Sequence, residues 1–202
     1  MRTIKKVASH IFIDGFGGMT QGLFATLIIG TMIQQIGLLI GGSTGNVIYL
    51  LGKAAAALTS AGIGVGVAVK YGESPLVTVS AAVAAMVGGY AGKITGGTFF
   101  VDGNAVLAGP GEPLGAFIAA FAGITCGHLV SGKTKVDIIV TPVITIGAGS
   151  VVGLLVGPPI SQMMTGLGSI INWATEQRPF IMGIVVSVVM GMVPVSYTHL
   201  TL

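Results

Sequence analysis

Three polar residues are spaced so that they could bind a solute together: Asn172, Thr175 and Glu176. In a helix, residues at positions i, i+3 and i+4 share one face, so this spacing would group an amide, a hydroxyl and a carboxylate. Such a group offers both donors and acceptors to the hydroxyls of a sugar or another polar solute. We predict that these residues bind substrate. In an alternative interpretation, Glu176 pairs with Arg178 at a membrane surface, where Trp173 acts as an interfacial anchor.

A fourth candidate for substrate binding is His128, because imidazole forms hydrogen bonds and exchanges protons near neutral pH. The alternative is a packed or interfacial histidine. His128 lies within Gly127–Thr134, which fits the phosphate-binding pattern G-x-x-x-x-G-K-[ST]. That pattern binds nucleotides when a strand precedes it and a helix follows it. Here apolar segments flank it on both sides, so we do not expect nucleotide binding.

Lys133, Lys135 and Asp137 follow this motif in a short polar loop. We predict that the loop faces the cytoplasm and meets a phosphorylated partner or product. Alternatively, the lysines set the orientation of the neighbouring membrane segments and Asp137 is a local counter-charge. No residue is assigned a catalytic role. The sequence predicts no metal site and no cofactor, and the loop that contains Asp102, Asn104 and Glu112 is expected to be a solvated connection.

The composition indicates the environment in which these residues work. Hydrophobic residues make up 52% of the 202 residues and charged residues only 7%, against about 25% charged residues in soluble domains. The mean hydropathy is +0.95. The net charge of +3 does not indicate nucleic-acid binding, because the basic residues form no stripe with interleaved aromatic residues. We therefore predict an all-α fold, a polytopic bundle of transmembrane helices in a lipid bilayer.

Apolar runs of nearly 20 residues predict about six spans. They lie at 19–41, 45–69, 75–92, 113–130 and 136–157, with a sixth starting near Phe180. The segment from Pro158 to Pro179 is more polar, and we expect it to be re-entrant or interfacial. Glycines recur every fourth residue within the spans, which favours close helix packing. These are Gly62/Gly66, Gly88/Gly92 and Gly149/Gly153/Gly157.

The basic residues predict a cytoplasmic N-terminus, because short cytoplasmic loops carry the excess of lysine and arginine. This orientation places six basic residues on the cytoplasmic side: Arg2, Lys5, Lys6, Lys70, Lys133 and Lys135. Three others would lie towards the opposite face: Lys53, Lys93 and Arg178.

The last eight residues, 195–202, depart from the Gly-rich apolar style of the chain. Their sequence VSYTHLTL resembles the translated end of a sequencing adapter, so we leave it out of the predicted domain. The predicted membrane domain is therefore 1–194, and we expect the native protein to continue beyond it.

Four longer runs resemble a known family: Ser131–Pro142, Val156–Ile160, Met164–Glu176 and Pro179–Gly183. They are similar to the membrane enzyme IIC family of the bacterial phosphotransferase system (PTS), in the branch that includes PfoR-type regulators. The resemblance extends over nearly all of residues 10–194. It implies a multi-pass protein of the bacterial inner (plasma) membrane.

The resemblance also implies a function. A IIC protein is the sugar permease of the system and works with cytoplasmic IIA and IIB proteins, which relay phosphate from phosphoenolpyruvate. It would take part in phosphotransfer without carrying a phosphorylated residue. In related families a glutamate near a re-entrant segment binds sugar hydroxyls, a role that the resemblance suggests for Glu176. A homodimer is a further assembly that we consider. The alternative is a membrane-embedded regulator or sensor with a permease-like fold.

Overall fold

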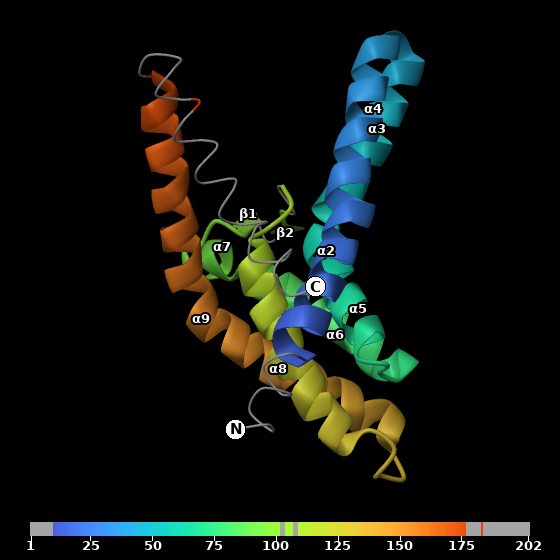
Figure 1. Cartoon of the computed structure of the whole chain (residues 1–202). Coiled ribbons are helices and arrows are strands. Elements are labelled where there is room, and N and C mark those ends of the chain that lie inside the picture. The colour runs from blue at the N-terminus through green and yellow to red at the C-terminus, as the bar shows by residue number, and fades with distance from the viewer. Residues whose placement is uncertain (1–9, 102–103, 107–108, 177–182, 184–202) are drawn as a thin grey trace. The chain divides into compact units, whose positions relative to one another are not determined.

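The computed structural model describes residues 10–101, 104–106, 109–176 and 183. Arg2, Lys5, Lys6 and Arg178, the span predicted to start near Phe180 and the segment 195–202 lie outside the described residues, apart from Gly183 within that span. The chain divides into two compact units, Met1–Ile160 and Ser161–Leu202. The helices of the first unit are shown in Figure 1.

The first span is a long helix built of four consecutive stretches. These are η1 (His10–Gly15), α2 (Phe16–Leu23), η2 (Phe24–Ile28) and α3 (Ile29–Ile40), where η1 and η2 have wider π-helical turns. From Ile13 to Ile40 it is apolar and long enough to cross a membrane. Gly41 and Gly42 follow with φ angles of +66° and +63°, a conformation that glycine adopts without strain and that reverses the chain.

The second predicted span is a bent pair of helices. α4 (Gly42–Ala57) and α5 (Thr59–Lys70) meet at an angle of 52°. α4 returns along α3, and the two backbones approach closely, because a Cβ added to Gly37 would lie 2.5 Å from the amide nitrogen of Tyr49. Figure 1 shows this pair side by side. α5 then packs against α2 instead of α3.

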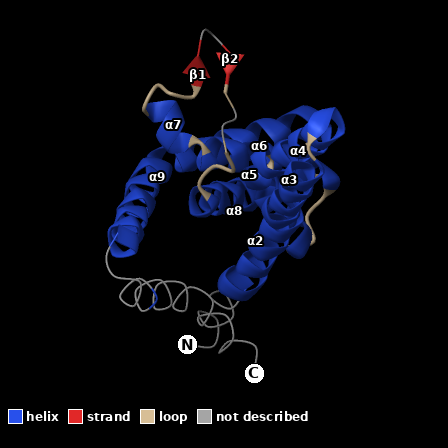
Figure 2. Cartoon of the chain, turned by 90° about the horizontal axis from the view of Figure 1, so that it is seen from above, coloured by secondary structure: helices blue, strands red, loops and turns tan. Residues whose placement is uncertain are grey.

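The core of the first unit lies where α5 meets α6 (Pro75–Gly89) and α8 (Pro113–Val130), and Figure 2 shows these helices grouped together. Its fully buried side chains include Ile63, Val67 and Val77. α6 and α8 run in opposite directions, since Gly88 near the end of α6 meets Gly115 near the start of α8.

Small residues let the helices approach as predicted. A Cβ on Gly18 of α2 would lie 2.5 Å from the carbonyl oxygen of Gly66, and one on Gly149 would lie 2.6 Å from that of Ala119. The expectation of close packing is confirmed at six of the seven predicted glycines: Gly62, Gly66, Gly88, Gly149, Gly153 and Gly157.

The connection between α6 and α8 folds back onto the helices. It contains α7 (Ala91–Thr95) and an antiparallel hairpin of two short strands, β1 (Phe100–Val101) and β2 (Asn104–Ala105). In this hairpin Phe100 pairs with Ala105. The Ser60 hydroxyl donates to the Pro110 carbonyl at 2.9 Å. These hydrogen bonds hold residues 109–112 against the helices, while Gly109 stays exposed and Pro110, Gly111 and Glu112 stay partly exposed.

α9 (Asp137–Glu176) is continuous for 40 residues and contains Pro142, Pro158 and Pro159. The sequence predicted a span ending near 157 and then a separate re-entrant or interfacial segment. The helix instead continues through the Pro158-Pro159 pair. Proline removes a backbone donor but is tolerated in membrane helices, where neighbouring groups satisfy the freed carbonyls.

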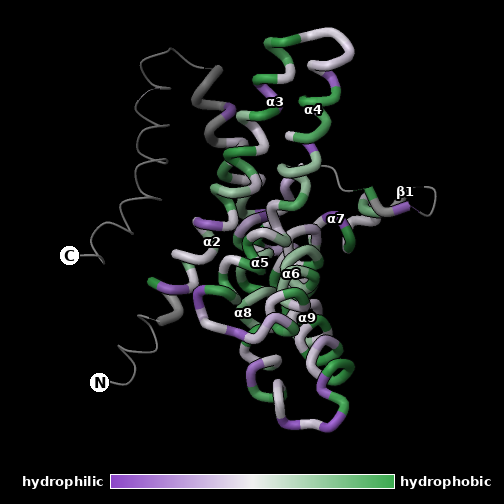
Figure 3. The backbone as a smooth tube through the Cα atoms, turned by 90° about the vertical axis from the view of Figure 1, so that its right-hand side faces the viewer, coloured by the Kyte–Doolittle hydropathy of each residue, from purple (hydrophilic) through white to green (hydrophobic). Residues whose placement is uncertain are grey.

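The helical character is confirmed apart from the short hairpin of β1 and β2, and the described residues contain fewer candidate spans than expected. Three helices are long and apolar enough to cross: Ile13–Ile40, Pro113–Val130 and Asp137–Ser169. The bent pair α4 and α5 makes up to four. α6 has only 15 residues, a rise of about 22 Å against about 30 Å of hydrocarbon. Figure 3 shows apolar residues along these helices and hydrophilic ones at the lower turns.

Candidate solute site

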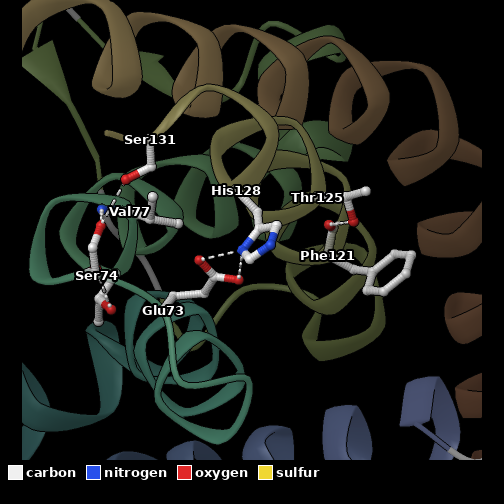
Figure 4. Close-up of polar contacts among 8 residues, drawn as sticks. Glu73, Ser74, Val77, Phe121, Thr125, His128 and Ser131 are labelled. Atoms are coloured by element: carbon white, nitrogen blue, oxygen red, sulfur yellow. Dashed lines mark hydrogen bonds and ion pairs between the residues drawn. The ribbon is translucent and has the colours of Figure 1, made fainter. Parts of the chain in front are cut away.

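The described structure pairs His128 with a carboxylate that sequence reasoning did not select. His128 Nδ1 lies 3.0 Å from one carboxylate oxygen of Glu73 and 3.2 Å from the other. The Glu73 side chain is only 8% exposed, whereas that of His128 is 71% exposed. Figure 4 shows the two side chains pointing toward each other. Polar groups that meet beside a pocket make this place a candidate binding site.

The turn that carries Glu73 is held by backbone hydrogen bonds. After α5 ends, the amide of Gly72 donates to the Val69 carbonyl and that of Glu73 to the Ala68 carbonyl, both at 3.1 Å. Gly72 has a φ angle of +68°, which closes the turn. Ser74 then caps α6 by accepting from the Val77 amide at 3.4 Å. The Glu73 carboxylate is thus attached to a fixed backbone.

An open pocket of about 250 Å³ lies beside this pair. It is lined by Tyr71, Glu73, Phe121, Ile124, Thr125, His128 and Leu129. The rings of Tyr71 and Phe121 meet edge to face, with centroids 6.2 Å apart. The pocket therefore combines aromatic walls with a nearly buried carboxylate and an exposed imidazole.

The pKa of Tyr71 in the same turn is raised to about 12, first by burial of the phenol and second by the nearby negative charge of Asp14. Both effects disfavour the phenolate. Tyr71 therefore presents a neutral hydroxyl at physiological pH. A Cβ added to Gly15 would lie 2.6 Å from the Tyr71 hydroxyl oxygen, so the start of the N-terminal helix lies at this end of the bundle.

The loop after α8 adjoins the same turn. The hydroxyl oxygens of Ser74 and Ser131 lie 3.3 Å apart. Asp137 accepts from the Gly132 amide at 3.0 Å and from the Thr141 hydroxyl at 2.6 Å. Asp137 therefore stabilises the loop and the first turn of α9. Lys133 and Lys135 are exposed.

The predicted solute-binding residues divide between the two units. His128 belongs to the first, whereas Asn172, Thr175 and Glu176 all lie in the last turns of α9, in the second unit. Their helical conformation gives the three residues the shared face that their spacing requires. Asn172 is exposed, and the side chains of Thr175 and Glu176 lie outside the described residues.

Sequence reasoning missed Glu73, Tyr71 and Phe121. A usable signal for Glu73 was its position as a carboxylate just before an apolar helix, where ionisable groups are rare and informative. Its partner His128 is 55 residues away, and no local pattern joins them. Among the described residues, no three His, Cys, Asp or Glu side chains gather as a metal site.

Comparison with known proteins bears on this arrangement. The family model described as "Phosphotransferase system, EIIC" matches residues 13–197. No curated protein matches the chain, and no solved structure does. The family match covers most of the chain, and the apolar helices fit a membrane component. The chain belongs to the EIIC family of the phosphotransferase system.

Proposed function

We propose that this protein is the membrane permease of a phosphoenolpyruvate-dependent sugar PTS, which binds a sugar and moves it across the bacterial inner membrane. The observation that carries the proposal is the EIIC match over residues 13–197. Three apolar helices of spanning length support it. The partners would be a sugar and the cytoplasmic IIA and IIB phosphocarriers. About six spans, membership of the PfoR branch and a homodimer are finer parts of the proposal.

A cytoplasmic N-terminus is supported by the way basic residues gather at one end of the bundle. Lys70 directly precedes the turn of Glu73, and the Ser74–Ser131 contact joins that turn to the loop of Lys133 and Lys135. Lys93 follows α6 at its opposite end. Three lysines at one end therefore agree with the excess expected on the cytoplasmic side.

For residue roles, we propose that Asn172, Thr175 and Glu176 of the second unit bind the sugar, and, independently of them, that His128 of the first unit does so. We also propose that the loop of Lys133, Lys135 and Asp137 meets the phosphorylated partner. The helical conformation at residues 172–176 supports the first set. The exposure of both lysines supports the role of the loop.

The test is sugar uptake into membrane vesicles that contain this chain and the IIA and IIB proteins encoded beside its gene. We expect uptake of one sugar that depends on phosphoenolpyruvate, and a loss of at least tenfold in Glu176→Gln. Asn172→Ala tests the same face. Uptake of no sugar by the parent chain would contradict transport and favour the alternative of a membrane-embedded regulator or sensor. Unchanged uptake by Glu176→Gln would remove that residue from the site.

A further inference from the structure

We propose that the pocket between the turn of Glu73 and the end of α8 is a binding site for a single monosaccharide ring. Glu73 accepts hydrogen bonds from the sugar hydroxyls, and His128 holds the Glu73 carboxylate in position. This inference rests on the proposed function and assigns it a site other than the face of Glu176.

The Glu73 carboxylate has acceptor capacity that the described residues do not use. An ionised carboxylate offers about four acceptor positions. Within the described part of the chain, both oxygens are contacted by one nitrogen, His128 Nδ1. The Glu73 side chain is only 8% exposed and lines the pocket, and a nearly buried carboxylate is stabilised by additional donors. Sugar hydroxyls are such donors.

The other walls suit the apolar face of a sugar ring. The ring carbons of a pyranose carry C–H groups that pack on aromatic side chains, and Tyr71 and Phe121 supply two aromatic rings. The Thr125 hydroxyl donates to the Phe121 carbonyl at 2.8 Å, so it retains acceptor capacity. Figure 4 shows His128 between Glu73 on one side and Phe121 on the other.

The volume of this open pocket suits a small solute. Its volume of about 250 Å³ falls just below the range of about 300–1,000 Å³ typical of sites for drug-sized ligands. One sugar ring fits this space better than an oligosaccharide or a nucleotide does.

The position of the pocket suits the proposed reaction partner. His128 and Leu129 lie in the last turn of α8, directly before the loop of Lys133 and Lys135. A sugar bound here would lie at the end of the bundle that carries this exposed basic loop. Phosphate is attracted to lysine side chains, so a phosphorylated partner docking on the loop would come close to the bound sugar.

The experiment measures equilibrium binding to the purified full chain in lipid nanodiscs. The probes are radiolabelled glucose, mannose, galactose, fructose and N-acetylglucosamine. We expect one of them to bind, and Glu73→Gln to weaken that binding about tenfold to a hundredfold, the effect of losing a charged hydrogen-bond acceptor. Phe121→Ala tests the aromatic wall. Glu112→Gln is the matched control, since Glu112 precedes α8 as Glu73 precedes α6, and it should bind within twofold of the parent.

Thermal unfolding of each variant shows whether it folds. A folded Glu73→Gln and a folded Phe121→Ala that both bind as the parent does would overturn the site while leaving transport intact. Equal losses in Glu73→Gln and Glu112→Gln would also overturn it, because the effect would not be local. A parent chain that neither binds nor takes up any of the sugars would overturn the proposed function together with the site.

Discussion

The two ends of the antiparallel α6/α8 pair are built from similar sequences and differ in what covers them. α6 is preceded by Gly72-Glu73-Ser74-Pro75 and α8 by Gly111-Glu112-Pro113. Both glycines have positive φ angles, +68° at Gly72 and +74° at Gly111. Both prolines stand at the start of their helix, where a missing amide donor has no cost. Each helix is therefore preceded by a glutamate held at a tight turn.

The surroundings of the two glutamates are different. At the Glu112 end, the chain closes over the helices: the Glu112 amide donates to the Gly89 carbonyl at 2.7 Å, and Tyr90 donates to the Gly109 carbonyl. At the Glu73 end, the carboxylate meets His128 beside an open pocket. The same local motif thus forms a closed connection at one end and an accessible polar site at the other.

The two ends should differ most in the stability lost when alanine replaces the glycine of each turn. In Gly111→Ala the new Cβ would lie 2.5 Å from Ser60 Oγ and 3.0 Å from the Gly89 carbonyl oxygen. With the positive φ angle, we expect a loss of about 2–4 kcal/mol in stability. Gly72→Ala meets open space and should lose only about 1–2 kcal/mol. Thermal unfolding followed by circular dichroism measures both, and equal losses would show that the Glu112 end is not packed more tightly.

A smaller loss of stability is expected when the hydrogen bond between Ser60 and the Pro110 carbonyl is removed at the Glu112 end. Ser60→Ala removes the donor to the Pro110 carbonyl in a buried environment, which costs about 1–3 kcal/mol. Hydrogen exchange should increase at residues 109–112. The comparison variant is Ser74→Ala at the open end, where loss of the helix cap costs about 0.5–2 kcal/mol and should leave residues 109–112 unchanged. Increased exchange there in both variants would mean that the two ends are coupled.

The carboxyl group of Glu112 should make the stability of the parent depend on pH more strongly than that of Glu112→Gln. Burial raises the pKa of Glu112, and the nearby Lys93 partly opposes that shift. A raised pKa means that the folded state binds the proton more tightly, so this contribution is present at low pH and is lost as pH rises through the folded-state pKa. Stability measured across the mildly acidic range should fall less with pH in Glu112→Gln than in the parent. An unchanged slope would contradict the burial of this carboxyl group.

The smallest expected effect is the change in alkaline titration caused by Tyr71→Phe. Because its pKa is raised to about 12, Tyr71 should stay neutral in an alkaline titration followed by ultraviolet absorbance up to about pH 11. The difference between the parent and Tyr71→Phe should therefore be negligible below that pH. A tyrosine ionising near pH 10 that disappears in Tyr71→Phe would show that the phenol is solvated and the pocket wall more open than described.

The sequence predicted the elements best where local chemistry marks their ends. The span 113–130 agrees with α8 at both bounds, because Pro113 begins it and the polar Ser131–Lys133 stretch follows it. The Pro158-Pro159 pair misled the prediction of α9, since proline ends helices in water but is carried within this one. The spacing of Asn172, Thr175 and Glu176 gave a shared face only on the condition of a helix, and α9 is helical over these residues.

The pairing of Glu73 with His128 was not predictable in the same way. It depends on how the antiparallel α6 and α8 align, and that alignment is set by Gly88 meeting Gly115 at the opposite end. The connection over Gly109–Glu112 was likewise missed, because its hydrogen-bond partners lie far along the chain, Ser60 on α5 and Tyr90 in the turn between α6 and α7. Contacts of this kind follow from packing, not from spacing along the chain.

The short length of α6 has a consequence for the electric field across the membrane. Its 15 residues place the turns of Glu73 and Glu112 about 22 Å apart along the helix axis. If water reaches both turns, the membrane voltage drops over this distance and not over the full thickness of about 30 Å of hydrocarbon. The field between the two carboxylates would then be about a third stronger than across the surrounding lipid.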